Sequence, residues 1–288
     1  MGQDNGRVGV RKMYKLFING AFVRSESARS DLVDGENVAR GSRKDARDAV
    51  VAARAAFEKW QAQAPALRGL VLYRLAEMME ARRAELAAQL VAGGTTDVDG
   101  AAREVSAAID RTIWYAGWCD KYLALASTRN PVAGPHFNFS TPEPTGIVIV
   151  AAPDEPALLG LVTMLVPPLV SGNAVIAIAS ERDPKTAVVF AECLATSDLP
   201  AGSANVITGE RSELLPVLAA HMDVNAIAAA GVGQSEAADL GRLAADNVKR
   251  THFEPGAARK AWFDARFDDL DRVLAYTELK TIWHPARI

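Results

Sequence analysis

The residues of this sequence that could do chemistry are carboxylates next to short apolar runs. Asp154 and Glu155 stand between two prolines, directly after the apolar run Ile147–Ala152. Paired carboxylates there could serve acid–base catalysis, because ligands of parallel sheets usually bind at the carboxyl ends of the strands. A solvated turn is the simpler interpretation of the same residues. Glu254, in the sequence HFEPG, is by itself an ordinary loop glutamate.

A glycine-containing turn is a second candidate. Gly231 and Gly233 follow an apolar run and precede a helical pattern. Phosphate groups often bind at such turns, since the N-terminus of a helix exposes unpaired N–H groups. The full glycine fingerprint fails, because Glu236 stands where a third glycine is needed. A tight turn between a strand and a helix, and a cofactor loop, both remain open.

Neither cysteine has the setting of a nucleophile. Cys119 and Cys193 both lie in helix-like sequence, which is typical of buried thiols, and they are too far apart in the chain to suggest a disulfide or metal framework. The histidines show no metal-binding spacing; they are His136, His221, His252 and His284. We therefore predict no metal site.

Long amphipathic helices dominate residues 1–125. Leu16–Val23 is a predicted hairpin with Asn19-Gly20 as its turn, and Ser42 is a predicted helix cap with Asp45 at the third position. Further helices are predicted over Ala66–Val91 and Val98–Leu125. Residues 128–146 are rich in proline and aromatic side chains, which predicts an extended excursion with strands.

From Gly146 onward, short apolar strands alternate with helices. This order predicts an α/β fold with a doubly wound parallel sheet, covered on both faces by helices. The predicted strands are Ile147–Ala152, Ala174–Ala179, Ala204–Thr208 and Val224–Ala230, and the predicted helices are Leu158–Val170, Lys185–Thr196, Ser212–His221 and Ser235–Asn247. The acidic run Asp264–Asp271 is predicted to be a solvated loop or the start of a helix.

The bulk composition excludes several classes of protein. The net charge is −3, so no basic surface points to nucleic acid or to anionic lipid. The longest apolar stretch, Ile147–Val170, is broken by prolines and carboxylates, which argues against a membrane helix. Met1–Lys15 has no apolar core, so we expect no signal peptide. A cytoplasmic location fits the few cysteines.

Several segments together resemble the aldehyde dehydrogenase superfamily. The most specific is DLPAGSANVITG at 198–209. The others are LFINGAFV (16–23), DAVVAARAAFEKW (48–60), WYAGWCDKY (114–122), EPTGIVIVAAP (143–153), LVSGNAVIAIASE (169–181), NVKRTHFEPG (247–256) and LAYTELKTIW (274–283). Their order and spacing hold from about Leu16 to Asp271. The resemblance implies a Rossmann-like NAD-binding domain formed by residues 14–127 and 146–271.

The resemblance also implies a small oligomerisation sheet, formed by a hairpin at 128–145 and a C-terminal strand within 272–288. In the family a whole catalytic domain separates the glutamate motif from the final strand, whereas here the two motifs nearly adjoin. We therefore expect the catalytic domain, which carries the nucleophilic cysteine of the family, to be absent. The chain is similar to the degenerate second unit of two-unit aldehyde dehydrogenases.

The family's functional positions are only partly kept. The resemblance assigns Glu254 to the general base and assigns cofactor contacts to Ala152, Pro153, Ser180, Glu181 and Gly231. Ile178 and Val232 replace the lysine and the serine that meet NAD or NADP in the family, which counts against cofactor binding. Asp154 and Glu155 stand near the place of an oxyanion-binding asparagine, and a carboxylate there would repel an oxyanion.

Three hypotheses follow. The first is a non-catalytic subunit, a pseudoenzyme that pairs with a complete aldehyde dehydrogenase subunit through the retained small sheet, because an unpaired sheet edge needs covering. The second is an NAD(P)-binding protein that contributes a cofactor site or acts as a nucleotide sensor. The third is an independent oxidoreductase that uses Glu254, Asp154 or Glu155. Pairing of the chain with a second copy of itself also remains open.

Overall fold

The structure is a computed structural model that describes residues 10–286. Residues 1–9 and 287–288 lie outside this range, and so do those parts of the predictions on the signal peptide and the C-terminal segment. No helix among the described residues combines the length and the apolar character that crossing a bilayer needs.

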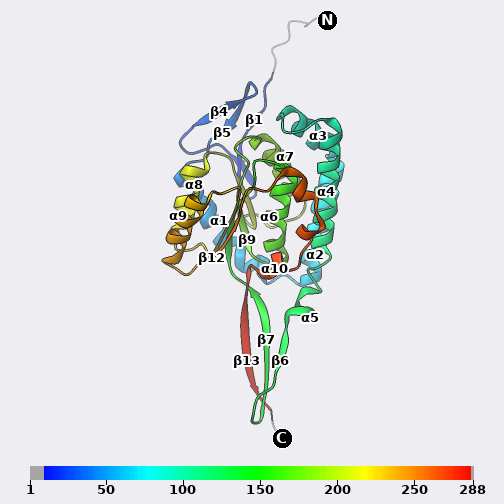
Figure 1. Cartoon of the computed structure of the whole chain (residues 1–288), viewed down its shortest axis with the longest axis vertical. Coiled ribbons are helices and arrows are strands. Elements are labelled where there is room, and N and C mark those ends of the chain that lie inside the picture. The colour runs from blue at the N-terminus through cyan, green and yellow to red at the C-terminus, as the bar shows by residue number, and fades with distance from the viewer. Residues whose placement is uncertain (1–9, 287–288) are drawn as a thin grey trace, which may run out of the picture.

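Within the described residues, a seven-stranded sheet forms the centre of the fold, with strand order β12-β11-β8-β9-β10-β2-β3 (Figure 1). Neighbouring strands from β12 to β10 are parallel, which confirms the predicted doubly wound core. The N-terminal hairpin extends this core, because β2 pairs antiparallel with β10. The bounds are β2 Leu16–Ile18, β3 Ala21–Val23, β8 Ile147–Ala151, β9 Ala174–Ile178, β10 Ala204–Ile207, β11 Ala226–Ala230 and β12 Arg250–Glu254.

Helices cover both faces of this sheet, and successive side chains of each strand alternate between two apolar clusters. Ile147 and Ile149 of β8 join one cluster, under α1 (Arg43–Gln61), α8 (Arg211–Ala219) and α9 (Gln234–Ala245). Val148 and Val150 join the other cluster. Its helices are α2 (Pro65–Ala81), α3 (Arg83–Ala92), α4 (Val98–Ala116), α6 (Ala157–Ser171) and α7 (Pro184–Ala195). A strand buried on both faces reads as a continuous apolar run, which is why these strands were predictable.

Two predicted helices are shorter in the structure. The helix predicted over Ala66–Val91 is divided into α2 and α3 at Arg82, because Arg82 leaves the helical conformation (φ −103°, ψ 15°). Its side chain donates to Glu192 of α7 at 2.9 Å. The helix predicted over Val98–Leu125 stops at Ala116, and a separate short helix, α5, covers Tyr122–Ala126. Buried apolar residues continue across the break at Arg82, so the periodicity does not reveal it.

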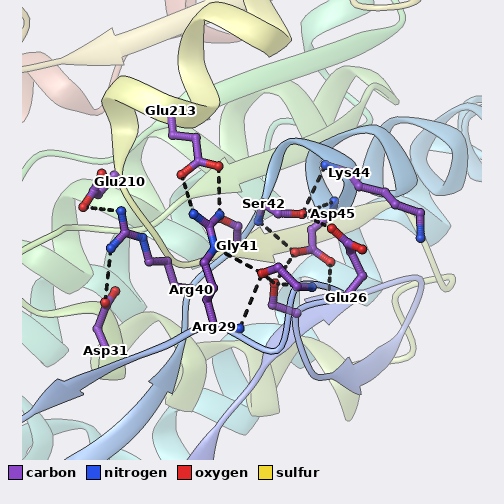
Figure 2. A network of polar contacts seen from close by, with 12 residues as sticks. Glu26, Arg29, Asp31, Arg40, Gly41, Ser42, Lys44, Asp45, Glu210 and Glu213 are labelled. Carbon is purple, nitrogen blue, oxygen red and sulfur yellow. Dashed lines mark hydrogen bonds and ion pairs between the residues drawn. The ribbon is translucent and has the colours of Figure 1, made fainter.

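A second small sheet near the N-terminus was not predicted. It consists of β1 (Met13–Tyr14), β5 (Glu36–Ala39) and β4 (Ser30–Val33), in that order. The segments around it contact the start of α8 through ion pairs that Figure 2 shows. Arg29 binds Glu213 with both terminal nitrogens, at 3.0 and 2.8 Å, and Arg40 pairs with Glu210. These contacts attach the small sheet to the first turn of α8.

The capping box predicted at the start of α1 is confirmed. Asp45 N donates to Ser42 Oγ at 3.2 Å, and Ser42 N donates to Asp45 Oδ2 at 2.8 Å (Figure 2). The reciprocal pair satisfies N–H groups that the first turn of a helix leaves without partners.

A three-stranded ribbon projects from the body of the described chain (Figure 1). Its strands are β6 (Thr128–Asn130), β7 (His136–Pro144) and β13 (Thr277–Pro285), with β7 in the middle. β13 pairs antiparallel with the whole of β7. The strands predicted in residues 128–146 and 274–283 are therefore present, and the role of this ribbon in assembly stays a prediction.

Candidate functional site

The predicted site residues gather at one edge of the central sheet. Asp154 follows β8, Ser180 and Glu181 follow β9, Gly231 follows β11, and Glu254 ends β12. The carboxyl ends of parallel strands meet at one edge, and ligands of doubly wound folds bind there. The edge also contains Arg211, the first residue of α8, which the sequence pattern did not identify.

The carboxylates after β8 are engaged by the loop after β9. Ser180 Oγ lies 3.3 Å from Asp154 Oδ1, to which it donates, and Glu181 N donates to the same oxygen at 3.0 Å. Glu155 forms an ion pair with Arg182. These contacts give both carboxylates a structural role in joining two adjacent loops, which is a simpler role than acid–base chemistry.

Glu181 and Arg211 are joined to each other. Glu181 Oε1 accepts a hydrogen bond from the backbone N of Arg211 at 2.7 Å. The Arg211 guanidinium reaches across the sheet edge, where Nη1 donates to Ala230 O at 3.1 Å. Arg211 is only 9% exposed, and its Nε and Nη2 have no hydrogen-bond partner among the described residues.

Of the remaining cofactor positions of the resemblance, Ala152 and Pro153 lie in packed surroundings, whereas Gly231 is exposed. Ala152 is fully buried and its N donates to Ile178 O at 3.0 Å. Pro153 packs so closely on α6 that a side chain at Gly160 would overlap with its ring. Gly231 adopts a left-handed conformation (φ +75°) that suits glycine, and its N donates to Glu254 O at 3.0 Å. Gly231 thus turns the chain from β11 into α9.

Glu254 is the last residue of β12 and not the loop residue that its local sequence suggests. Its carboxylate forms an ion pair with Arg272 at 2.5 Å, and both side chains are 25% exposed. The pair borders an open pocket of about 420 Å³, which His252 and Tyr276 also line. The charge of Glu254 is therefore balanced by Arg272, and the pair attaches the chain segment after β12 to the end of that strand. In this arrangement the carboxylate is not free to act as a base.

That segment, residues 255–276, folds as a compact unit that we call the cap. It contains the 3₁₀ turns Arg259–Phe263 and Ala265–Phe267 and the short helix α10, Asp271–Leu274. The rings of Trp262 and Phe267 stack with centroids 4.7 Å apart. The acidic run within the cap was predicted to be solvated or to begin a helix; α10 begins at its end, but Asp268 pairs with a buried arginine at 2.8 Å.

The buried arginine is Arg111 of α4, which is 4% exposed. Its Nε donates to Asp268 Oδ1 at 2.8 Å, and its Nη1 donates to Thr163 Oγ1 at 2.7 Å and to Trp262 O at 2.8 Å. Tyr115 of α4 adds a hydrogen bond to Phe267 O at 2.8 Å. An arginine on the apolar face of α4 is the one sequence signal that could have pointed to this anchor.

Both cysteines lie inside the fold. Cys119 and Cys193 are fully buried, and burial raises the pKa of each thiol to about 12. A thiol with such a pKa is almost wholly protonated at neutral pH and is a poor nucleophile. Over residues 10–286, no group of three or more metal-binding side chains is placed to hold an ion.

Comparison with known proteins identifies the family. Residues 31–284 match the model of the aldehyde dehydrogenase family. The chain is 31% identical to a putative aldehyde dehydrogenase, DhaS, of Bacillus subtilis over 84% of its own length and 50% of that relative. It is also 31% identical to the cytosolic 10-formyltetrahydrofolate dehydrogenase of Xenopus laevis, over 86% of this chain and 29% of that one.

Solved structures agree with this match. An aldehyde dehydrogenase mutant from Bacillus cereus superposes with a TM-score of 0.80 at 25% identity, over 85% of this chain and 51% of that chain. The P. syringae indole-3-acetaldehyde dehydrogenase AldA, solved with NAD+, gives 0.79 at 28% identity over 85% and 51%. The chain spans about half the length of these structures and of its B. subtilis relative. By sequence and by fold, the chain belongs to the aldehyde dehydrogenase family.

Proposed function

We propose that this chain is a non-catalytic aldehyde dehydrogenase-like subunit that pairs with a complete NAD(P)-dependent aldehyde dehydrogenase and supports it. The observation that carries the proposal is the cap. The resemblance expects a catalytic domain between Glu254 and the final strand, and the structure has at this position a short folded unit that Arg111 and Tyr115 anchor to α4. The cap leads directly into β13.

The side chains that remain do not make a catalytic set. Glu254, at the position of the general base, forms an ion pair with Arg272. The carboxylate of Asp154 accepts hydrogen bonds from Ser180 and Glu181. A base without a nucleophile has nothing to activate, and both thiols of the chain are buried and protonated. A supporting role requires none of these groups.

The projecting ribbon supports the pairing. β13 lies at its edge and pairs with β7 on one side only, as far as the described residues extend. Two large apolar side chains of β13 are exposed, Leu279 at 69% and Trp283 at 59%. An open sheet edge with apolar side chains can accept a strand of another chain, which gains main-chain hydrogen bonds and apolar burial. The proposed compartment is the cytoplasm, since two free thiols suit a reducing environment.

The experiment is co-expression of this chain with a complete aldehyde dehydrogenase of the same organism, followed by measurement of the dissociation constant. Replacing both Leu279 and Trp283 with aspartate removes roughly 1.5–3 kcal/mol of apolar burial per side chain. We expect the dissociation constant to rise by a factor of about 100 or more.

The matched control is Leu32→Asp, because Leu32 is 71% exposed on β4, at the opposite end of the molecule from the ribbon (Figure 1). It should leave the affinity unchanged. If the unmodified chain does not associate with any complete aldehyde dehydrogenase of its organism, the proposed function is wrong.

A further inference from the structure

The family implies a dinucleotide cofactor. In this fold the crevice for such a cofactor lies between the start of α8 and the turn from β11 to α9, above the carboxyl ends of β8 and β9. In doubly wound folds a nucleotide needs polar groups and free space at this edge. In this chain the two positions that meet the cofactor in the family are apolar and buried, and the side chain of Arg211 lies between the two sides of the crevice.

Apolar side chains fill the floor of the crevice. Ile178 is fully buried and Val232 is 6% exposed, and both belong to the apolar cluster under α8 and α9. Leu214 of α8 and Leu240 of α9 belong to the same cluster. Neither substituted position faces an open cleft, so no polar contact to a ribose or a phosphate can start there.

Arg211 fills the upper part of the crevice. Its backbone N occupies one carboxylate oxygen of Glu181, and its guanidinium spans to Ala230 O. Arg211 Nη1 lies 4.0 Å from the point that a Cβ on Gly231 would take. Arg211 therefore contacts the loop after β9 through its backbone N and the end of β11 through its guanidinium. These are the two sides between which a nucleotide would have to pass.

Ion pairs with the segments around the small N-terminal sheet fix the start of α8. Glu210 and Glu213, which flank Arg211 in the sequence, pair with Arg40 and Arg29 (Figure 2). These ion pairs fix the first turn of α8 against the small N-terminal sheet. Rotation of the turn that would swing Arg211 out of the crevice would have to break them.

We propose that Arg211 is an internal plug that closes the dinucleotide crevice, so that the chain takes neither NAD nor NADP. This inference goes beyond the proposed pairing function and does not rest on it. The plug is poorly satisfied, because two of the three guanidinium nitrogens lack partners among the described residues. A buried cation with so few hydrogen bonds adds little stability, so its truncation should leave the fold intact.

The test is a titration with NAD, NADP and ADP-ribose, followed by calorimetry and by ligand-observed NMR. The unmodified chain should show no saturable binding up to millimolar concentrations. Arg211→Ala removes the guanidinium from the crevice and leaves the backbone N that binds Glu181 in place. This variant should bind ADP-ribose with a dissociation constant of roughly 1 mM or below.

The matched control is Arg182→Ala, which removes the same charge from the same sheet edge without opening the crevice, and it should not bind. Saturable binding of NAD or NADP to the unmodified chain would overturn the proposal, whatever the variants do. A folded Arg211→Ala protein that does not bind ADP-ribose would show that Arg211 is not the plug. Should Arg211→Ala not fold, Arg211→Ser, which also removes the guanidinium, is judged by the same two outcomes. None of these results bears on association with a partner enzyme.

Discussion

The anchor between Arg111 and the cap allows a quantitative prediction. Arg111→Ala removes a guanidinium that is 4% exposed and that binds Asp268, Thr163 and Trp262 O. Two of these three partners are neutral oxygens that would be left without this donor inside the fold, and Asp268 would lose its cation. Leaving buried partners of a charged group unpaired costs about 3–5 kcal/mol in the free energy of unfolding.

The assay is equilibrium unfolding in urea, combined with limited proteolysis of the native protein. A loss of about 3–5 kcal/mol should lower the urea midpoint strongly, and the first cuts should fall within residues 255–276. Arg103→Ala is the control, because Arg103 lies exposed on the same helix and its loss should change stability by no more than about 0.5 kcal/mol. An Arg111→Ala protein within about 1 kcal/mol of the unmodified chain would refute the view that the cap is an integral part of the fold.

Three further predictions concern the cysteines, the pocket histidine and the ion pair of the cap. Because burial raises the pKa of Cys119 and Cys193 to about 12, a thiol reagent at pH 8 should label neither in the native protein and both after unfolding; rapid native labelling would contradict their burial. Burial lowers the pKa of His252 below its usual 6.5, so the unfolded chain binds this proton more readily. The stability conferred by neutral His252 is complete above about pH 6.5 and is lost as the pH falls toward the folded-state pKa. In His252→Gln, the free energy of unfolding should therefore depend less on pH between pH 7 and 5. An unchanged pH dependence would count against this assignment. Glu254→Gln and Arg272→Gln should each cost about 1 kcal/mol and the double variant no more than either, whereas additive losses in this cycle would mean that the ion pair is not formed.

Much of the sheet could be predicted because of how parallel strands are buried. Ile147–Ala151 and Ala174–Ile178 are buried at every residue, so each reads as an unbroken apolar run between turns. β12 does not show this pattern of continuous burial. Arg250 and Thr251 are exposed on an edge strand, and no continuous apolar run marks it. Glu254 therefore looked like a loop residue although it ends a strand.

The small N-terminal sheet had a signal that the pattern of long helices obscured. Asp34 and Gly35 form the turn between β4 and β5, and both have positive φ values, 49° and 76°. Asp-Gly between short strands is a strong hairpin signal. The strands themselves are half exposed and polar in part, so their residues alone do not predict a sheet.

The candidate site was only partly predictable, for a different reason. The order of strands and turns indicated the edge where Ser180, Glu181 and Gly231 meet. Their actual partners come from distant parts of the chain: Arg211 reaches Ala230 O, and Arg272 reaches Glu254. No local periodicity encodes a pair of residues on different elements, so the groups that occupy the site became visible only with the fold.

The most direct test of the pairing function is native mass spectrometry of this protein, purified gently from its own cells. The proposed function predicts a complex that contains this chain together with a longer aldehyde dehydrogenase chain, and the complex should fall apart when Leu279 and Trp283 are replaced with aspartate. A monomer, or an oligomer of this chain alone, would contradict it.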